Sequence, residues 1–128
     1  MDEARIAMLK VRRVYDPPDS EDGVRILADR LWPRGLKKED ARLDGWRKDL
    51  APSDGLRQWF GHEPEKWEEF KSRYRRELAE AGKDQELRAL AARSATETVT
   101  ILYGSKERRY NNAVALREFI ESARMEAS

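Results

Sequence analysis

The strongest constraint on the fold of this chain is a helical stripe within residues 64–81, PEKWEEFKSRYRRELAEA. The apolar positions of the stripe recur at steps of three and four and are Trp67, Phe70, Tyr74, Leu78 and Ala81. Pro64 suits the first helical turn, where its missing N–H is not needed, and Gly82 is a typical residue just past a helix end. The spacing predicts an amphipathic helix over residues 64–81 whose apolar face packs against a core.

Three further segments are rich in β-branched and apolar residues and predict strands over residues 6–15, 24–31 and 96–103. Further helices are predicted at about residues 84–93 and 113–124, with short ones at 37–41 and from Ser53 or Asp54 through Phe60. This order indicates a single α/β domain, residues 1–128, whose mostly parallel sheet of three or more strands is covered by helices. The turn-forming residues 16–23 are short for a parallel crossover, so an antiparallel first pair in a mixed sheet is the alternative.

The chain has no cysteine and one histidine, which excludes disulfides, cysteine nucleophiles, zinc–thiolate sites and a histidine-cluster metal site within one chain. We therefore expect no metal and no cofactor. The net charge is +1, from 26 basic and 25 acidic residues, so a nucleic-acid partner is not expected. Without a long apolar run or a signal-peptide core, the chain is expected to be cytoplasmic and to have no membrane partner. Composition does not predict the oligomeric state.

The stretch ADRLWPRG, residues 28–35, places an acid, two arginines and a tryptophan where the second predicted strand ends. Ligands of open parallel sheets bind beyond the carboxyl ends of the strands. The third predicted strand ends in a basic loop, residues 104–112, that leads into a helix and suits an anion. We therefore expect an anionic or nucleotide-like small molecule here, and the expected contacts are Asp29, Arg30, Arg34, Lys106, Arg109 and Asn111. The alternative is that structural ion pairs close the sheet edge and the loop is only solvated.

Two residues, His62 and Asp29, are candidates for acid–base chemistry. An imidazole that precedes a helix beside aromatic residues can carry a proton near neutral pH, although it can equally cap the helix or bond a backbone carbonyl. Asp29 is also a candidate partner of Asp16 in a carboxylate pair. Whether the protein is an enzyme stays open. The alternative to a ligand site is a regulatory or partner-binding module that presents Trp32 and Trp46 beside arginines.

Three long segments resemble the YeaO-like branch of the domain of unknown function 488 family: VRRVYDPPDSEDGVRILADRLWPRG, LAPSDGLRQWFGHEPEKWEEFKSRYRREL and LYGSKERRYNNAVALREF. The resemblance covers about residues 10–119. It implies a small bacterial or archaeal cytoplasmic protein with an α/β sheet and a parallel pairing of the first two strands. It implies no particular reaction or cofactor.

The residues that match the motifs of the family are Tyr15, Asp29, Arg30, Trp32, Pro33, Arg34, Gly35, Trp59, Phe60, Gly61, His62, Pro64, Trp67, Tyr103, Asn111 and Asn112. The chain departs from the family pattern at Tyr110, where a histidine often stands directly before the paired asparagines. If that histidine takes part in chemistry, this chain lacks it. The departure lowers the expectation of catalysis.

Overall fold

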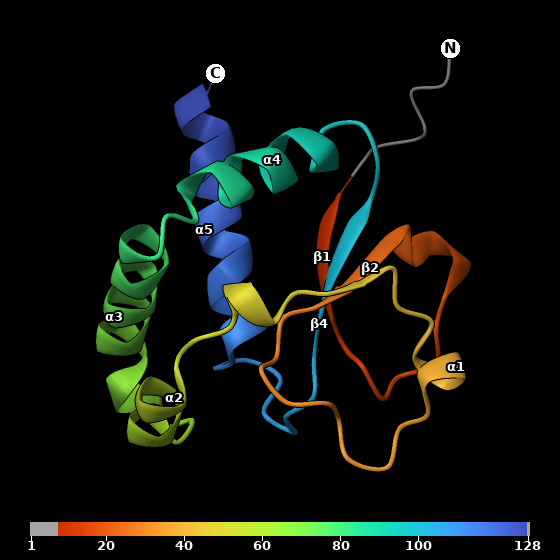
Figure 1. Cartoon of the computed structure of the whole chain (residues 1–128), viewed down its shortest axis with the longest axis horizontal. Coiled ribbons are helices and arrows are strands. Elements are labelled where there is room, and N and C mark those ends of the chain that lie inside the picture. Colours follow the sequence, from red (N-terminus) through yellow and green to blue (C-terminus); the bar gives the residue numbers. More distant parts are fainter. Residues whose placement is uncertain (1–7, 128) are drawn as a thin grey trace.

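The computed structural model describes residues 8–127 (Figure 1). The strands are β1 (Leu9–Arg13), β2 (Val24–Leu27), β3 (Gly45–Trp46) and β4 (Val99–Tyr103). The helices are α1 (Lys38–Ala41), α2 (Asp54–Phe60), α3 (Trp67–Glu80), α4 (Asp84–Ser94) and α5 (Asn112–Ala127). Short 3₁₀ turns lie at Ser20–Asp22, Lys48–Leu50 and Pro64–Lys66. Within these residues, no helix has the length and apolar character needed to span a membrane.

The strands of the described chain form one parallel sheet in the order β1-β4-β2-β3. Ile101 of β4 is in register with Val11 of β1 on one side and with Ile26 of β2 on the other. The predicted α/β class is therefore confirmed, and the alternative of an antiparallel first pair is wrong. The first two strands are parallel but do not pair with each other, because β4 lies between them.

The connection from β1 to β2 crosses the sheet without a full helix. It consists of residues 14–23, which contain only one 3₁₀ turn. A chain segment of that length reaches about 33 Å when extended. A strand as short as β1 is only about 17 Å long, and two strand spacings add about 10 Å. The connection spans this path because the strands are short, which is why the usual minimum length for a parallel crossover does not apply.

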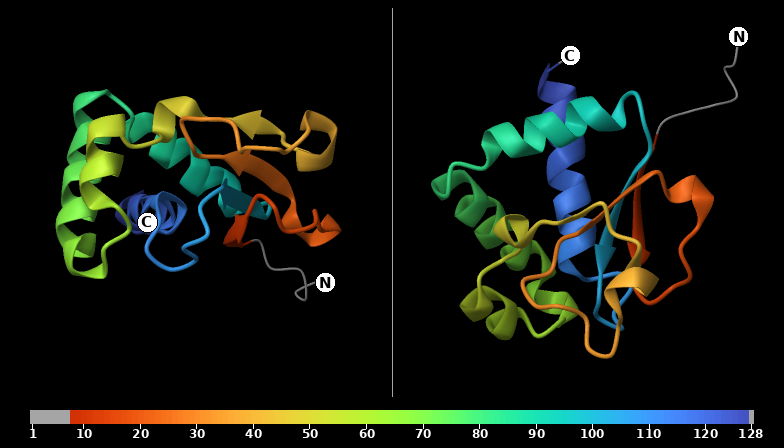
Figure 2. Two further views of the ribbon diagram at one scale, coloured as in Figure 1. Left: turned by 90° about the horizontal axis from the view of Figure 1, so that it is seen from below. Right: turned by 45° about the vertical axis from the view of Figure 1, so that its right-hand side comes forward.

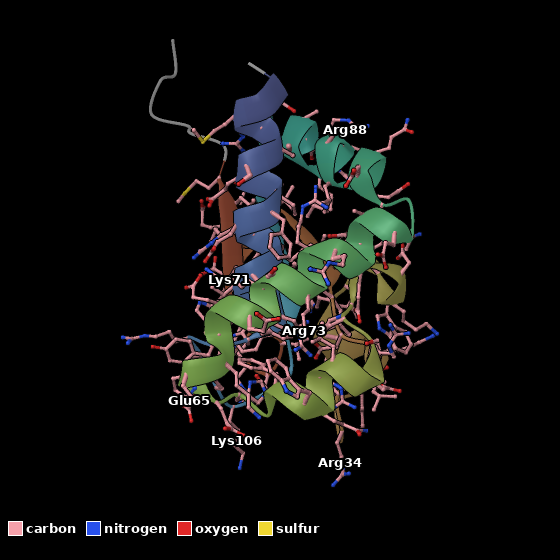
Figure 3. All side chains as sticks on the ribbon, turned by 90° about the vertical axis from the view of Figure 1, so that its left-hand side faces the viewer. Arg34, Glu65, Lys71, Arg73, Arg88 and Lys106 are labelled. Atoms are coloured by element: carbon pink, nitrogen blue, oxygen red, sulfur yellow. The ribbon has the colours of Figure 1, made fainter. Side chains whose placement is uncertain are left out.

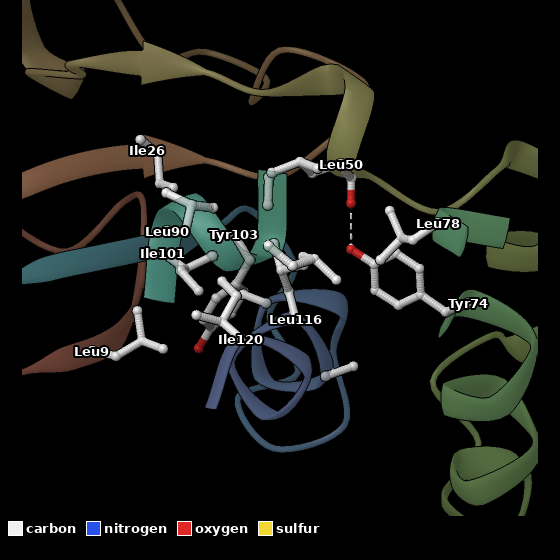
Figure 4. Packing of buried hydrophobic residues seen from close by; sticks show 14 of the residues in the cluster. Leu9, Ile26, Leu50, Tyr74, Leu78, Leu90, Ile101, Tyr103, Leu116 and Ile120 are labelled. Carbon is white, nitrogen blue, oxygen red and sulfur yellow. Dashed lines mark hydrogen bonds between the residues drawn. The ribbon is translucent and has the colours of Figure 1, made fainter. Parts of the chain in front are cut away.

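One face of the sheet is covered by helices. α5 packs against β1 and β4, and α4 packs against α5 (Figure 1 and Figure 2). The buried side chains between this layer and the sheet include Leu9, Ile26, Ile101, Leu116 and Ile120 (Figure 4). The core of the protein therefore lies between α5 and the central strands.

Helix α3 lies beside α2 and α5 rather than directly on the sheet (Figure 2). The Phe70 ring stacks on Phe60 with centroids 4.1 Å apart, and the Tyr74 ring meets the edge of Phe119 at 5.3 Å. The buried Tyr74 hydroxyl donates a hydrogen bond to the Leu50 carbonyl (Figure 4). The predicted helix is confirmed, and Phe70, Tyr74 and Leu78 of its stripe are buried, whereas Trp67 is half-buried and Ala81 is exposed. Helix α5 separates this face from the strands.

The opposite face of the sheet is covered by the segment 28–44, which includes the short helix α1. A second apolar cluster packs there and includes Val14, Leu27, Leu102, Trp32 and Trp46. The two indole rings meet edge to face with centroids 5.3 Å apart, and each ring N–H donates to a backbone carbonyl. Both tryptophans are partly buried and serve the packing of this layer. The structure therefore gives no support to a partner-binding surface built on their exposed rings.

A buried acid, Asp22, ties the crossover to the sheet. Its carboxylate lies 2.8 Å from the guanidinium of Arg12, 2.5 Å from that of Arg25 and 3.5 Å from the ammonium of Lys10. Its carbonyl accepts a hydrogen bond of 2.7 Å from the Thr100 hydroxyl of β4. Asp22 is 0% exposed and Arg25 is 4% exposed. Three cations therefore surround one carboxylate that has no contact with water.

Local signals in the sequence set the start of β2 and both ends of α2. Gly23 precedes β2 with a φ of +65°, and a Cβ there would lie 2.2 Å from the Thr98 carbonyl oxygen, so a side chain does not fit. The Ser53 hydroxyl accepts a hydrogen bond from the backbone N–H of Leu56, and Gly61 ends α2 in the left-handed conformation. Ser53, rather than the alternative Asp54, is the N-cap of this helix.

Candidate functional site

Asp29 lies where the carboxyl ends of two neighbouring strands meet. It follows the last residue of β2, Leu27, by two positions. Its Oδ2 accepts a hydrogen bond of 2.7 Å from the N–H of Gly104, which directly follows β4. Its Oδ1 accepts one of 3.1 Å from the side-chain amide of Asn112, which also donates to the Ala28 carbonyl at 2.8 Å. The ends of β2 and β4 and the start of α5 therefore converge on this carboxylate.

The Asp29 side chain is half-buried. Burial raises its pKa above the ordinary value of 3.8, and the hydrogen bonds from Asn112 and Gly104 only partly offset this effect. The nearby guanidinium of Arg57 also favours the ionised form. A carboxyl whose pKa is raised by burial, beside specific charged partners, is typical of functional sites.

Two arginines lie beside this acid, and both are partly exposed. Arg30 donates to the carbonyls of Pro52 at 3.3 Å and Ala51 at 3.4 Å, while Arg57 of α2 lies 3.4 Å from the Asp54 carboxylate. The exposed fraction is 39% for the Arg30 side chain and 48% for that of Arg57. Each guanidinium has five N–H donors, so most of them are left for a ligand or water.

His62 lies in the turn between α2 and α3 and has a φ of +58°. A positive φ is unusual for a residue with a β-carbon, and backbone strain of this kind often occurs at ligand sites. The Nδ1 of the ring lies 2.8 Å from the Tyr110 carbonyl, and the ring meets the edge of Phe60 at a centroid distance of 5.5 Å. The imidazole therefore joins the α2–α3 turn to the loop that precedes α5.

These groups line a common cavity of about 210 Å³ at the carboxyl edge of the sheet. Its polar lining residues are Asp29, Arg30, Arg57, His62, Ser105 and Asn112. The structure thus brings together three of the residues expected from the sequence, Asp29, Arg30 and His62. Residues 8–127 contain no group of three or more acidic or histidine side chains arranged to hold a metal ion.

The other expected ligand contacts lie outside the lining of the cavity. Arg34 and Lys106 project into solvent at the same end of the molecule (Figure 3). Arg109 is also exposed, with its guanidinium 5.9 Å from the centre of the Tyr110 ring. These three residues leave the candidate set because their side chains do not line the cavity. Asn111 leaves it for a different reason.

Asn111 is 0% exposed and acts as the N-cap of α5. Its side-chain oxygen accepts a hydrogen bond of 3.0 Å from the Val114 N–H, and its amide donates to the Glu107 carbonyl at 2.9 Å. A side chain that is fully buried and bonded at both ends has no contact to offer a ligand. The neighbouring Asn112 faces the cavity instead.

Replacing Asn111 by alanine is expected to lower the free energy of unfolding by about 1–2 kcal/mol, because α5 loses its cap and the Glu107 carbonyl loses a donor. The matched variant Asn111→Ser keeps a capping oxygen and is expected to lose less. Thermal unfolding of the two variants measures the difference. Equal stability of wild type and Asn111→Ala would contradict the capping role.

Three polar lining residues, Arg57, Ser105 and Asn112, are not among the ligand contacts expected from the sequence. Arg57 had no distinguishing signal, since it is one of many arginines on charged helices. Asn112 was visible as half of an asparagine pair, but the sequence does not show which of two adjacent residues caps the helix. The start of α5 at Asn112 decides this, because it leaves Asn111 in the capping position.

The fold and this cavity define a small α/β protein with a polar site at the carboxyl edge of a parallel sheet. Residues 8–128 match the profile described as the inactive DUF488-N3 subclade, and the chain belongs to this family. It is 41% identical over 114 residues to the uncharacterized protein YeaO of Escherichia coli, which covers 89% of this chain and 97% of YeaO. The expected relation to the YeaO-like branch is therefore confirmed.

A second relative is an uncharacterized protein of Mycobacterium tuberculosis. It is 47% identical over 96 residues, which cover 75% of this chain and 81% of the relative. No solved structure matches the chain. The comparisons give the family of the chain, and both of these relatives are uncharacterized proteins.

Proposed function

We propose that the protein binds a small anionic, nucleotide-like molecule in the cavity at the strand ends. The observation that carries this proposal is the pair Arg30 and Arg57 at a cavity that also contains the half-buried acid Asp29. Paired guanidinium groups attract an anion, and their fork geometry suits a phosphate or a carboxylate. The volume of about 210 Å³ is below the range of about 300–1,000 Å³ typical of drug-sized ligands, so it suits one part of a nucleotide, such as its base, better than the whole molecule.

The proposal is for binding without a chemical step. The subclade to which the chain belongs is described as inactive. His62 is the sole imidazole of the chain, and Tyr110 stands where the resemblance described above implies that a histidine is often found. The Nδ1 of that imidazole is already engaged with the Tyr110 carbonyl. These features support a protein that holds a ligand rather than one that converts it.

Thermal unfolding in the presence of candidate ligands tests the proposal. Suitable probes are inorganic phosphate, ribose 5-phosphate and the nucleoside 5′-monophosphates. A ligand present at about 100 times its Kd stabilises the fold by about 2.7 kcal/mol. For a domain of this size the expected rise in melting temperature is about 10 °C. The absence of a shift with every one of these compounds would contradict anion binding.

The substitution Arg57→Ala is expected to weaken the binding of a phosphate ester at least tenfold, because a hydrogen bond to a charged group contributes about 1.5–3 kcal/mol. Alanine is a good helix former, so the ligand-free melting temperature is expected to change little. Calorimetric titration measures the affinity.

The matched control is Arg34→Ala, which removes the same charge from the same end of the molecule but outside the cavity. This variant is expected to bind as tightly as wild type. Equal losses in the two variants would indicate a diffuse electrostatic effect instead of a site.

A further inference from the structure

The Asn112 side chain presents an acceptor to the cavity. Its amide nitrogen uses both of its hydrogens, one on the Ala28 carbonyl and one on the Asp29 carboxylate. A flipped amide would set its oxygen against these two acceptors, so its orientation is fixed by the network. The amide oxygen has no hydrogen-bond partner within residues 8–127, and it is left to accept a bond from a ligand.

His62 and Ser105 also offer acceptors, because the hydrogen that each of them donates is already used on a backbone carbonyl. The Tyr110 carbonyl can only accept, so the Nδ1 of His62 carries the hydrogen and the Nε2 of the neutral ring is an acceptor. The Ser105 hydroxyl donates to the Glu107 carbonyl at 3.2 Å, which leaves its oxygen as an acceptor. The Asp29 carboxylate adds lone pairs beyond the two that it uses. The interior of the cavity is therefore rich in acceptors, and the donors lie on the arginines.

The remainder of the lining is apolar and consists of Leu31, Ala51, Pro52, Phe60 and Phe70. Such walls suit the face of a flat ring, whereas the hydroxyl groups of a sugar would be desolvated against them. A buried acceptor that a ligand leaves without a donor costs free energy. The favoured ligand therefore brings N–H donors into the interior on a flat framework.

We infer that the ligand class is a nucleotide whose base carries an exocyclic amino group, as adenine and cytosine do. The amino group donates to the Asn112 amide oxygen and to the Nε2 of His62, beside the Asp29 carboxylate, and the phosphate binds Arg30 and Arg57. This inference rests on the proposed anion binding and names its ligand class. A base with an oxo group in place of the amine would set a carbonyl oxygen against the acceptors, so the site selects the amino form.

Calorimetric titration of the wild-type protein with matched pairs of nucleotides tests the inference. The pairs are adenosine against inosine 5′-monophosphate and cytidine against uridine 5′-monophosphate, which interchange amino and oxo groups at equal phosphate charge. The amino member of each pair is expected to bind at least tenfold more tightly.

Equal affinities within the pairs, or ribose 5-phosphate binding as tightly as the nucleotides, would overturn the inference and leave anion binding in place. The absence of binding by all of these compounds would overturn the anion site itself. The two failures are therefore distinguishable.

The variant His62→Asn adds a test within the protein. Asparagine tolerates the positive φ of residue 62, so the fold is expected to be retained, while the Nε2 acceptor is lost. The preference for adenosine over inosine 5′-monophosphate is expected to fall at least threefold, with the affinity for ribose 5-phosphate unchanged. A preference equal to that of wild type would overturn the placement of the amine among these acceptors. Thermal unfolding without a ligand checks that the variant is folded.

Discussion

Replacing Phe70 by alanine is expected to lower the free energy of unfolding by about 3–5 kcal/mol. Phe70 is 1% exposed, stacks on Phe60 and is flanked by Trp67 and Tyr74. The truncation leaves a cavity where α2 and α3 meet, and the rings around it cannot close the gap. Urea unfolding followed by tryptophan fluorescence measures the loss as a lower midpoint with an unchanged slope.

The matched control for this substitution is Arg76→Ala, which lies on the exposed side of the same helix. Its effect is expected to stay within about 0.5 kcal/mol, as is usual for surface positions. If the Phe70 variant unfolded at the urea concentration of wild type, the packing of α3 described above would be wrong.

The substitution Asp22→Asn is expected to lower the free energy of unfolding by about 3–5 kcal/mol, because it leaves the buried guanidinium of Arg25 without its counter-charge. The same change at Asp49 is the control. Asp49 pairs with Arg47 and Lys83 at the surface, where its side chain is 37% exposed, so its loss is expected to cost no more than about 1 kcal/mol. Urea unfolding of both variants at neutral pH gives the comparison.

The stabilisation that the Asp22 carboxylate contributes is expected to decrease as the pH falls. Burial alone would raise the pKa of this carboxyl, but hydrogen bonds from the Asp19 backbone N–H and the guanidinium groups of Arg12 and Arg25 hold it below the ordinary 3.8. A carboxyl with a lowered pKa stabilises the fold above its unfolded-state pKa, and this contribution is lost as the pH falls through the folded-state value. The stability difference between wild type and Asp22→Asn is therefore expected to shrink below pH 3.8. A difference that grew on acidification would contradict the role of the charge.

The local elements of this fold could be predicted because their signals lie within a few residues of one another. The α3 stripe, the Ser53 cap and the Gly61 stop are patterns of spacing and turn chemistry that hold whatever the rest of the chain does. Asp29, Arg30 and His62 could be selected for a similar reason. Each of them stands beside a predicted strand end or helix start.

The arrangement of the strands could not be predicted in the same way. β3 has only two residues, Gly45 and Trp46, which is too short for an alternating pattern. β2 ends at Leu27 rather than continuing to Leu31, because Asp29 turns to bond Gly104 at the end of β4. Gly104 lies far from Asp29 along the chain, so no pattern in the residues near Asp29 predicts this hydrogen bond. The same limit applies to Arg57, which enters the cavity through the packing of α2.

The position of β4 in the middle of the sheet has a consequence for the synthesis of the protein. β1 is made first, yet β4 is its only strand partner in the described chain, and β4 is the last strand to leave the ribosome. The nascent chain therefore carries an unpaired edge for most of its translation, and closing the sheet is a late, non-local step. Charged residues protect such an edge from pairing with other chains. Lys10, Arg12 and Arg13 place positive charge along β1 while the strand is unpaired. They therefore protect the strand before Lys10 and Arg12 form their ion pairs with Asp22.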